Sequence, residues 1–194
     1  MACLITKGRA TNCKDVVGGI NRVWLCDYDA LGTITTGSND EVTDATGTVT
    51  LFQYDVKGSG NTMVTTANVS RDAGTAYFST VLSLSLPKLT KEDNKELKLL
   101  AYGRPQIIIE DRNSNFLLLG KEHGCELTSA SIETGGGLGD ASQYTLEFTS
   151  EELLPPNFCD GATSSNPTAG WSSCTETITV GTNMARAHPF IGSE

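Results

Sequence analysis

The sequence is poor in the residues from which most catalytic and metal sites are built. It has only two histidines, His123 and His188, among 194 residues, and no Cys-x-x-Cys pair. A zinc site needs such ligands at recognisable spacings, and the Gly-x-Ser-x-Gly motif of many hydrolases is missing. Adjacent carboxylates such as Glu151 and Glu152 fall in a strand-like run, where neighbours point to opposite faces. We therefore expect no catalytic residue, no metal site, no cofactor and no enzyme activity.

A phosphate-binding loop is also lacking, although segment 135–140 is glycine-rich. It reads Gly-Gly-Gly-Leu-Gly-Asp, without the Gly-Lys-Ser/Thr ending of such loops. It leads into an expected strand, so there is no helix N-terminus to hold a phosphate. We interpret it as a flexible connection between strands, where glycine permits positive φ angles.

Long hydrophobic runs are absent. No stretch approaches the about 18 apolar residues of a membrane span, and no apolar segment follows Lys7 and Arg9 as it would in a signal peptide. We expect folding in a cytoplasm, where disulfides are rare, and no membrane partner. Cys26 and Cys125 lie in strand-like runs and are expected to be small buried side chains. Whether Cys159 and Cys174 pair is left open.

Basic residues are outnumbered, with 14 Lys and Arg against 23 Asp and Glu and a net charge of −9. A protein that reads a nucleic-acid sequence needs cations to displace counterions from phosphates, so this balance argues against such a function. It suits a surface that DNA passes without sticking, because like charges repel. It equally suits an ordinary acidic, soluble surface.

What the sequence does contain is a series of short strands and one helix. Segment 48–69 is interpreted as a β-hairpin with its turn at 57–61, and 32–47 as a long surface loop with a short strand at 32–36. A capping-box-like start at Thr90 predicts a helix to about Tyr102. The other expected strands are 22–27, 76–86, 106–110, 116–119, 125–133, 143–149 and 175–180. We predict an N-terminal arm (1–20), a β domain (21–158) and a C-terminal extension (159–194) that becomes partly ordered on assembly.

Strand 76–86 has the clearest alternation. Phe78, Leu82 and Leu84 fall on one face, and Ser79 and Ser83 on the other. It carries few charges for an edge strand, which would normally be protected against uncontrolled pairing. It is therefore either internal to a sheet or paired with another chain by β-augmentation.

Several short motifs between residues 77 and 158 resemble the major tail (tail tube) proteins of tailed bacteriophages. The order of strands, one helix, a hairpin and further strands also fits that family. The motifs are Leu97 to Ala101, Gln106 to Asn113, Phe116 to Gly120, Gly124 to Thr128, Thr134-Gly135, Gly139-Asp140, Tyr144 to Phe148, and Glu152 followed by Pro155-Pro156.

The resemblance implies an antiparallel β-sandwich or barrel with one helix, which assembles with itself into hexameric rings. The rings stack into the tube of a virion tail, through which the genome DNA is delivered without sequence-specific binding. The implied further partners are sheath, tape measure and baseplate proteins, and assembly occurs in the host cytoplasm.

Within this framework the sequence supplies two sets of candidate contact residues. Loop residues are candidates for contacts between rings, and hydroxyl and carboxylate side chains on strands are candidates for the lumen. The ring-to-ring candidates are Gly37, Asn39, Asp40, Lys57 and Asn61. The lumen candidates are Ser79, Ser83, Ser85, Glu133 and Glu147.

Two other interpretations remain open at this stage. One is another β-rich component of a virion or injection system, such as a tail terminator, a neck protein or a secreted tube homologue. The other is a ligand-binding β-sandwich, which would need clustered exposed aromatic residues. Aromatic residues make up only 7% of the chain, Trp24 lies in an apolar run, and Trp171 stands isolated.

Overall fold

A computed structural model describes residues 7–10, 14–58 and 60–181 of the chain. This part is mainly β, with a single helix, as predicted. Its elements are β1 (Ile20–Cys26), β2 (Ile34–Thr36), β3 (Val42–Ala45), β4 (Thr48–Asp55), β5 (Thr62–Ser70), β6 (Thr75–Pro87), α1 (Lys91–Leu100), β7 (Gln106–Asp111), β8 (Phe116–Leu119), β9 (Glu126–Glu133), β10 (Gln143–Glu152), β11 (Asn157–Phe158) and β12 (Thr175–Val180).

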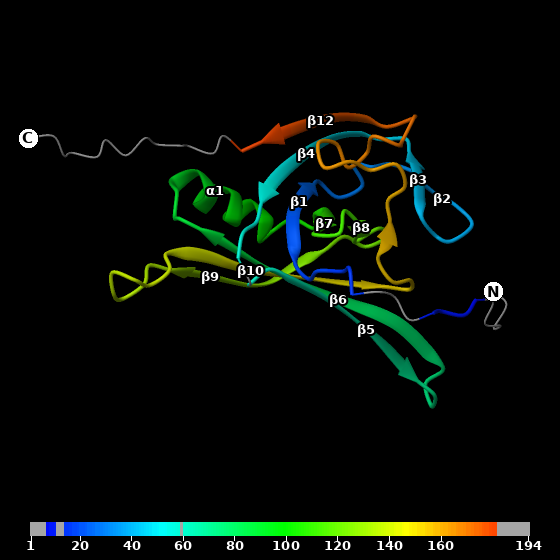
Figure 1. Ribbon diagram of the computed structural model, residues 1–194, viewed down its shortest axis with the longest axis horizontal. Helices are drawn as coiled ribbons and strands as arrows, with labels where there is room; N and C mark the ends of the chain where they lie inside the picture. The colour runs from blue at the N-terminus through cyan, green and yellow to red at the C-terminus, as the bar shows by residue number, and fades with distance from the viewer. Residues whose placement is uncertain (1–6, 11–13, 59, 182–194) are drawn as a thin grey trace, which may run out of the picture.

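The strands form two layers and a small separate hairpin (Figure 1). A six-stranded sheet has the order β11-β8-β7-β1-β4-β12, and a four-stranded sheet the order β5-β6-β10-β9. β2 and β3 pair with each other. The sheets are open and form no closed barrel, and β12 runs parallel to β4, so the predicted antiparallel sandwich holds only for the remaining strand pairs.

β1 lies between two hydrophobic cores because both of its faces are apolar. Val23 and Leu25 point into the core shared with the four-stranded sheet. Trp24 and Cys26 point into a second core on the opposite face of the six-stranded sheet. Burial on both sides explains why the sequence of this strand is a continuous apolar run and not an alternation of apolar and polar residues. The predicted strand at 22–27 is confirmed as β1.

The predicted hairpin at 48–69 is wrong. β4 pairs with β1 and β12, whereas β5 pairs with β6. Segment 57–61 thus carries the chain from one sheet to the other. The tight turn of this region lies instead at residues 71–74, where Gly74 has a φ of 63° that favours glycine.

Segment 32–47 is more than a surface loop. β2 and β3 form a hairpin, and Val42 and Ala45 are fully buried in the second core. The abundance of Thr, Gly and Asp hid β3, because the apolar signal of the strand pair is limited to Ile34, Val42 and Ala45.

The predicted C-terminal extension is built into the same body as far as it is described. β12 adds a strand to the six-stranded sheet, and the isolated Trp171 is in fact buried in the second core. The predicted boundary after Phe158 therefore falls inside the folded body and does not separate two parts of it. Residues 182–194 lie outside the described residues.

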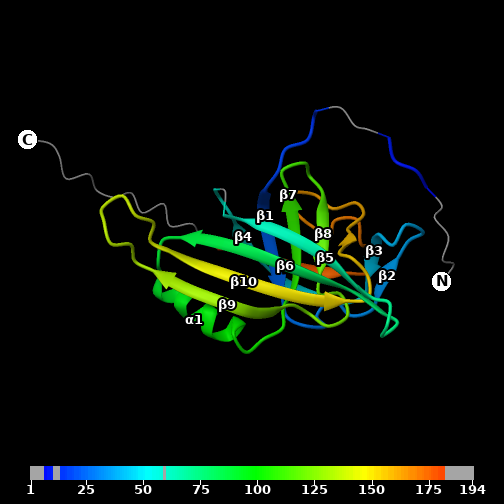
Figure 2. The same ribbon diagram turned by 90° about the horizontal axis from the view of Figure 1, so that it is seen from below.

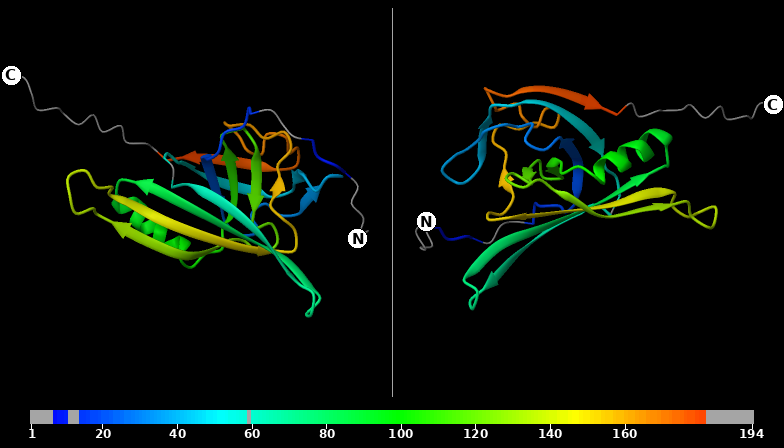
Figure 3. Two further views of the ribbon diagram at one scale, coloured as in Figure 1. Left: turned by 60° about the horizontal axis from the view of Figure 1, so that its bottom comes forward. Right: turned by 180° about the vertical axis from the view of Figure 1, so that it is seen from behind.

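Helix α1 begins as predicted. The Thr90 hydroxyl accepts a hydrogen bond from the backbone N–H of Asp93 at 3.0 Å, which makes Thr90 the N-cap. Leu97 and Leu100 pack against the core between the sheets, while Ala101, the C-cap residue, is exposed. The helix closes one end of the gap between the two sheets (Figure 3). No helix in the described part of the chain is long and apolar enough to cross a membrane.

The four cysteines in the described residues are free thiols. Cys26 and Cys125 are buried, as predicted. Cys159 and Cys174 do not pair with each other, and both pack against the second core.

Candidate functional site: an acidic sheet face with two open edges

The outward face of the four-stranded sheet is the most distinctive surface of the molecule (Figure 2). Strand register decides which side chains share it. Ser83 lies opposite Glu147 on β10 and opposite Thr62 on β5, and Ser79 lies opposite Glu151. Because side chains alternate between faces, Ser85 joins this surface, while Leu82 and Leu84 point into the core.

The strand residues of the outward face include carboxylates but no cations. None of the four strands contains a Lys or Arg. Glu133 shares the face because it pairs with Gln143, and Glu126 because it pairs with Thr149. Serine and threonine side chains lie between them, as Ser83 does beside Glu147, and Val64 and Val81 share the face. The formal charges that the four strands contribute to this face are all negative, while Arg104, from outside the sheet, lines a hollow with Glu126 and Glu151.

All five lumen candidates therefore lie on one continuous face. The sequence missed two further carboxylates of this face, Glu126 and Glu151. Glu151 had a sequence signal, since it follows Glu147 by an even number of residues on one strand. Glu126 had none, because a register shift between β9 and β10 decides its direction.

The face is bounded by two strands that are paired on one side only. β5 and β9 form the edges of the four-stranded sheet, and β6 lies between β5 and β10. Strand 76–86 is thus internal, and the alternative that it pairs directly with another chain is wrong. An edge strand presents a row of unpaired N–H and C=O groups, to which another strand can add.

The ring-to-ring candidates are not brought together. Gly37, Asn39 and Asp40 lie in the turn between β2 and β3, where the Glu41 carboxylate accepts a hydrogen bond from the Asn39 N–H at 2.8 Å. Lys57 is exposed in the crossing between the sheets.

Asn61 does not fit its predicted place in a contact surface. Its side chain is 2% exposed. It donates to the Lys57 carbonyl at 3.1 Å and accepts from the Ser85 N–H at 2.8 Å. These bonds fix the crossing from β4 to β5, so Asn61 is a structural residue.

The hollow that contains His123 shows how its polar groups are used. A cavity of about 290 Å³ lies beneath the end of β10 and includes His123 and Glu152. The Glu152 carboxylate accepts from the backbone N–H groups of Glu122 and His123, each at 3.0 Å, and so closes a turn. Across the described residues, no group of three metal-ligating side chains is suitably placed for a metal ion.

Comparison with known proteins adds little to this description. No protein-family model matches the chain, and no curated protein matches it. Among solved structures, the chain is similar to one from "Virion of native gene transfer agent (GTA) particle", with a TM-score of 0.36 and 13% identity, over 55% of this chain and 88% of that one.

Proposed function

We propose that the protein is a structural subunit of a virion tail tube, which assembles with itself into stacked hexameric rings. The observation that carries the proposal is the four-stranded sheet. It has one apolar face on its own core, one polar face toward solvent, and an unpaired edge on each side.

A sheet of this kind can continue from copy to copy. If β9 of one copy lies beside β5 of the next, the edge groups of both find partners and a ring closes around the polar faces. The lining would then include serine and threonine hydroxyls, Val64 and Val81, together with Glu126, Glu133, Glu147 and Glu151. Such a lining repels the phosphate backbone, so DNA can move without being held.

The shape of the sheet also suits stacking. The β5–β6 hairpin extends beyond the rest of the body at one end, and the loop between β9 and β10 extends at the other (Figure 3). Opposite projections on one subunit permit a head-to-tail contact, which builds an open-ended stack. Sheath, tape measure and baseplate proteins would be the further partners of such a tube in a virion tail.

The test is assembly by the purified chain. Negative-stain microscopy over a range of protein concentrations is expected to show rings or tubes, and sedimentation to show a matching shift in mass. A chain that stays monomeric at millimolar concentration and is missing from purified particles would refute the proposal.

A second candidate is another component of a virion or injection system that uses the same sheet edges in a single ring. Copy number separates the two, since a terminator or neck protein is present in a few copies per particle and a tube subunit in many. The ligand-binding β-sandwich has less support, because Trp24 and Trp171 are both buried.

A further inference from the structure

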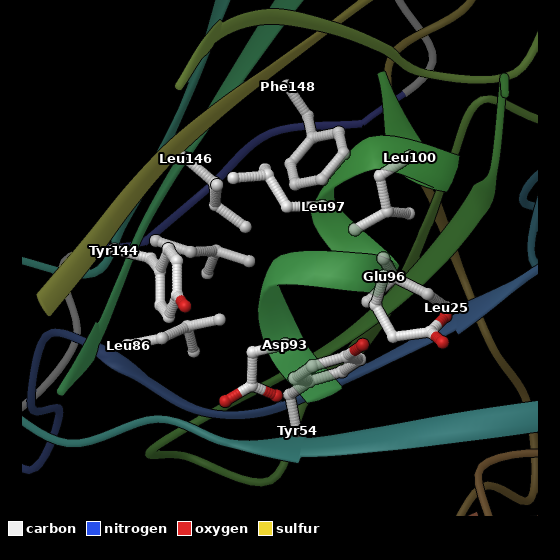
Figure 4. A pocket seen from close by; sticks show the side chains of 11 residues that line it. Leu25, Tyr54, Leu86, Asp93, Glu96, Leu97, Leu100, Tyr144, Leu146 and Phe148 are labelled. Atoms are coloured by element: carbon white, nitrogen blue, oxygen red, sulfur yellow. The ribbon is translucent and has the colours of Figure 1, made fainter. Parts of the chain in front are cut away.

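Two hollows with apolar walls differ in how much room they offer. The hollow beneath α1 has only about 20 Å³ of free space, because Leu97 of α1 and Phe148 of β10 point toward one another in it (Figure 4). The hollow at the end of β10, which we call the β10 hollow, has about 290 Å³. A cavity of about 150 Å³ is enough for a benzene ring. The β10 hollow therefore has room for a whole side chain of a partner.

The wall of the β10 hollow is rich in leucine and proline. Leu118 and Leu119 belong to the buried cores, whereas Leu153 is 73% exposed. Covering such a side chain is favourable because it removes apolar surface from water. The apolar residues of the wall are Leu118, Leu119, Leu153, Leu154, Pro155 and Pro156.

The charged groups of the β10 hollow are already engaged within the subunit. Lys121 forms an ion pair with Glu122 at 3.1 Å. The Glu152 carboxylate accepts from two backbone N–H groups at 3.0 Å each. The Asn157 amide donates to the Asp40 carbonyl at 2.6 Å. An apolar guest would leave these groups paired, so it avoids the usual cost of burying polar groups without partners.

A fully exposed leucine stands at the tip of the loop between β9 and β10. This residue, Leu138, is carried by a turn that the Asp140 carboxylate closes. The carboxylate accepts from the N–H of Gly136 at 2.9 Å and from the N–H of Gly137 at 2.6 Å, and the Asp140 N–H donates to the Gly137 carbonyl at 3.1 Å. Single exposed leucines are common on protein surfaces, but this one is held outward at the projecting end of a sheet.

Leu138 cannot reach the β10 hollow of its own copy. Its loop precedes β10, whereas the hollow includes Ser150 and Glu152 at the other end of that strand. β10 has 10 residues, and an antiparallel strand of this length spans about 30 Å. The front and rear views agree that the two features lie at opposite ends of the sheet (Figures 1 and 3). A projection at one end and a hollow at the other allow copies to join head to tail in an open series.

We propose that Leu138 of one copy inserts into the β10 hollow of a copy in the adjacent ring. Its side chain then covers Leu153 and the neighbouring prolines, and the turn closed by Asp140 keeps it directed outward. The inference rests on the proposed tube subunit and assigns to it a contact between rings. This contact is separate from the β5 and β9 edges, which join copies within a ring.

Cross-linking between two cysteine variants tests the contact directly. Full-length unlabelled Leu138→Cys and ¹⁵N-labelled Leu153→Cys chains are mixed under assembling conditions and treated with a short bis-maleimide. We expect peptides that join position 138 of a light copy to position 153 of a heavy copy, as read by mass spectrometry. In the control mixture, Leu99→Cys on the exposed side of α1 replaces Leu153→Cys. A missing 138–153 link, or 138–99 links of equal yield, would overturn the proposal.

The length of the assemblies provides an independent readout. Leu138→Asp is expected to raise the protein concentration needed for tubes at least about tenfold, since it replaces a buried apolar contact with a charge. Single rings should still form, because the β5 and β9 edges are unchanged. Leu99→Asp is the matched control and should change this concentration less than about twofold. Leu138→Met keeps an apolar side chain of similar volume and should still form tubes.

The insertion and the tube subunit fail differently. If the wild-type and Leu138→Asp chains form tubes at the same concentration, the insertion is wrong and the tube subunit stands. If the wild-type chain forms rings that never stack, the insertion is wrong and a component of a single ring is favoured. If the wild-type chain forms neither rings nor tubes, the tube subunit is wrong and the insertion falls with it.

Discussion

Arg22 and Glu110 form an ion pair at 3.5 Å on neighbouring strands, at the edge of the second core. The Glu110 side chain is 3% exposed, and its other oxygen accepts a hydrogen bond from the Ser164 hydroxyl. Arg22 also contacts Asp55 at 2.7 Å and donates to the Ser164 carbonyl. One arginine thus links β1, β4, β7 and the segment that leads to β12.

Removal of Arg22 is expected to destabilise the fold strongly. Arg22→Met leaves the buried Glu110 carboxylate without its partner, a change that costs about 3 kcal/mol of unfolding free energy. Urea unfolding measures the change in unfolding free energy. Tryptophan fluorescence reports the transition, because the Trp24 ring lies beside Arg22. The control is Arg71→Met in the exposed β5–β6 turn, for which we expect less than about 0.5 kcal/mol. Equal effects would refute the structural role of Arg22.

Asn61 is predicted to act on stability and not on contacts between rings. Asn61→Ala removes both hydrogen bonds of a buried side chain and should lower the unfolding free energy of the monomer by about 1–3 kcal/mol. Asn39→Ala, at an exposed turn, is the matched substitution and should leave stability almost unchanged. Thermal unfolding of the two variants compares them, and a stable Asn61→Ala variant with defective assembly would contradict this assignment.

The attachment of the C-terminal segment should weaken in acid. Hydrogen bonds from the backbone and then the side chain of Ser173 lower the pKa of Asp44 below 3.8. The unfolded chain then binds the proton more readily than the folded one, so this contribution is present above pH 3.8 and is lost as the pH falls through the folded pKa. Hydrogen exchange of β12 amides at pH 5 and pH 3 measures the loosening. In the Asp44→Asn variant, the additional increase in β12 amide exchange at pH 3 should be absent.

The buried thiols are predicted to resist alkylation. Burial raises the pKa of Cys26 and of Cys125 to about 12 each, so almost no thiolate is present at pH 8. Iodoacetamide at pH 8 should modify both only after denaturation, as read by peptide mass spectrometry. Rapid labelling of Cys125 in the native chain would show that the core at β9 opens or is packed differently.

The charge of the outward sheet face should decide whether DNA is retained. Glu147→Lys replaces one of its carboxylates with a cation, and assembled variant tubes are expected to repel DNA less than the wild type, by a difference that shrinks as salt rises. The wild-type tubes should release DNA at all salt concentrations. Glu92→Lys on α1 makes the same change away from this face, and equal DNA retention by that variant would place the lumen elsewhere.

Local pattern was enough to identify most elements. The hydroxyl and leucine faces of β6 follow from alternation alone, since a strand turns successive side chains to opposite sides. The start of α1 follows from Thr90 and its bond to Asp93. The continuous apolar run of β1 predicts burial on both faces, which the two cores confirm.

Pairing could not be predicted in the same way because it joins residues far apart in the chain. The sequence favoured β4 with β5, its nearest neighbour, whereas the fold pairs β4 with β12 from the other end of the chain. Trp171 appears isolated in its polar segment, and only that segment's return to the six-stranded sheet buries it.

The sequence by itself determined an acidic, mainly β chain with one capped helix, because composition and periodicity are local properties. The tertiary structure alone decided that Glu126, Glu133, Glu147 and Glu151 share one face. It also decided that β5 and β9 are the edges of the four-stranded sheet. Each of these depends on register and sheet order, which are set by contacts between distant segments.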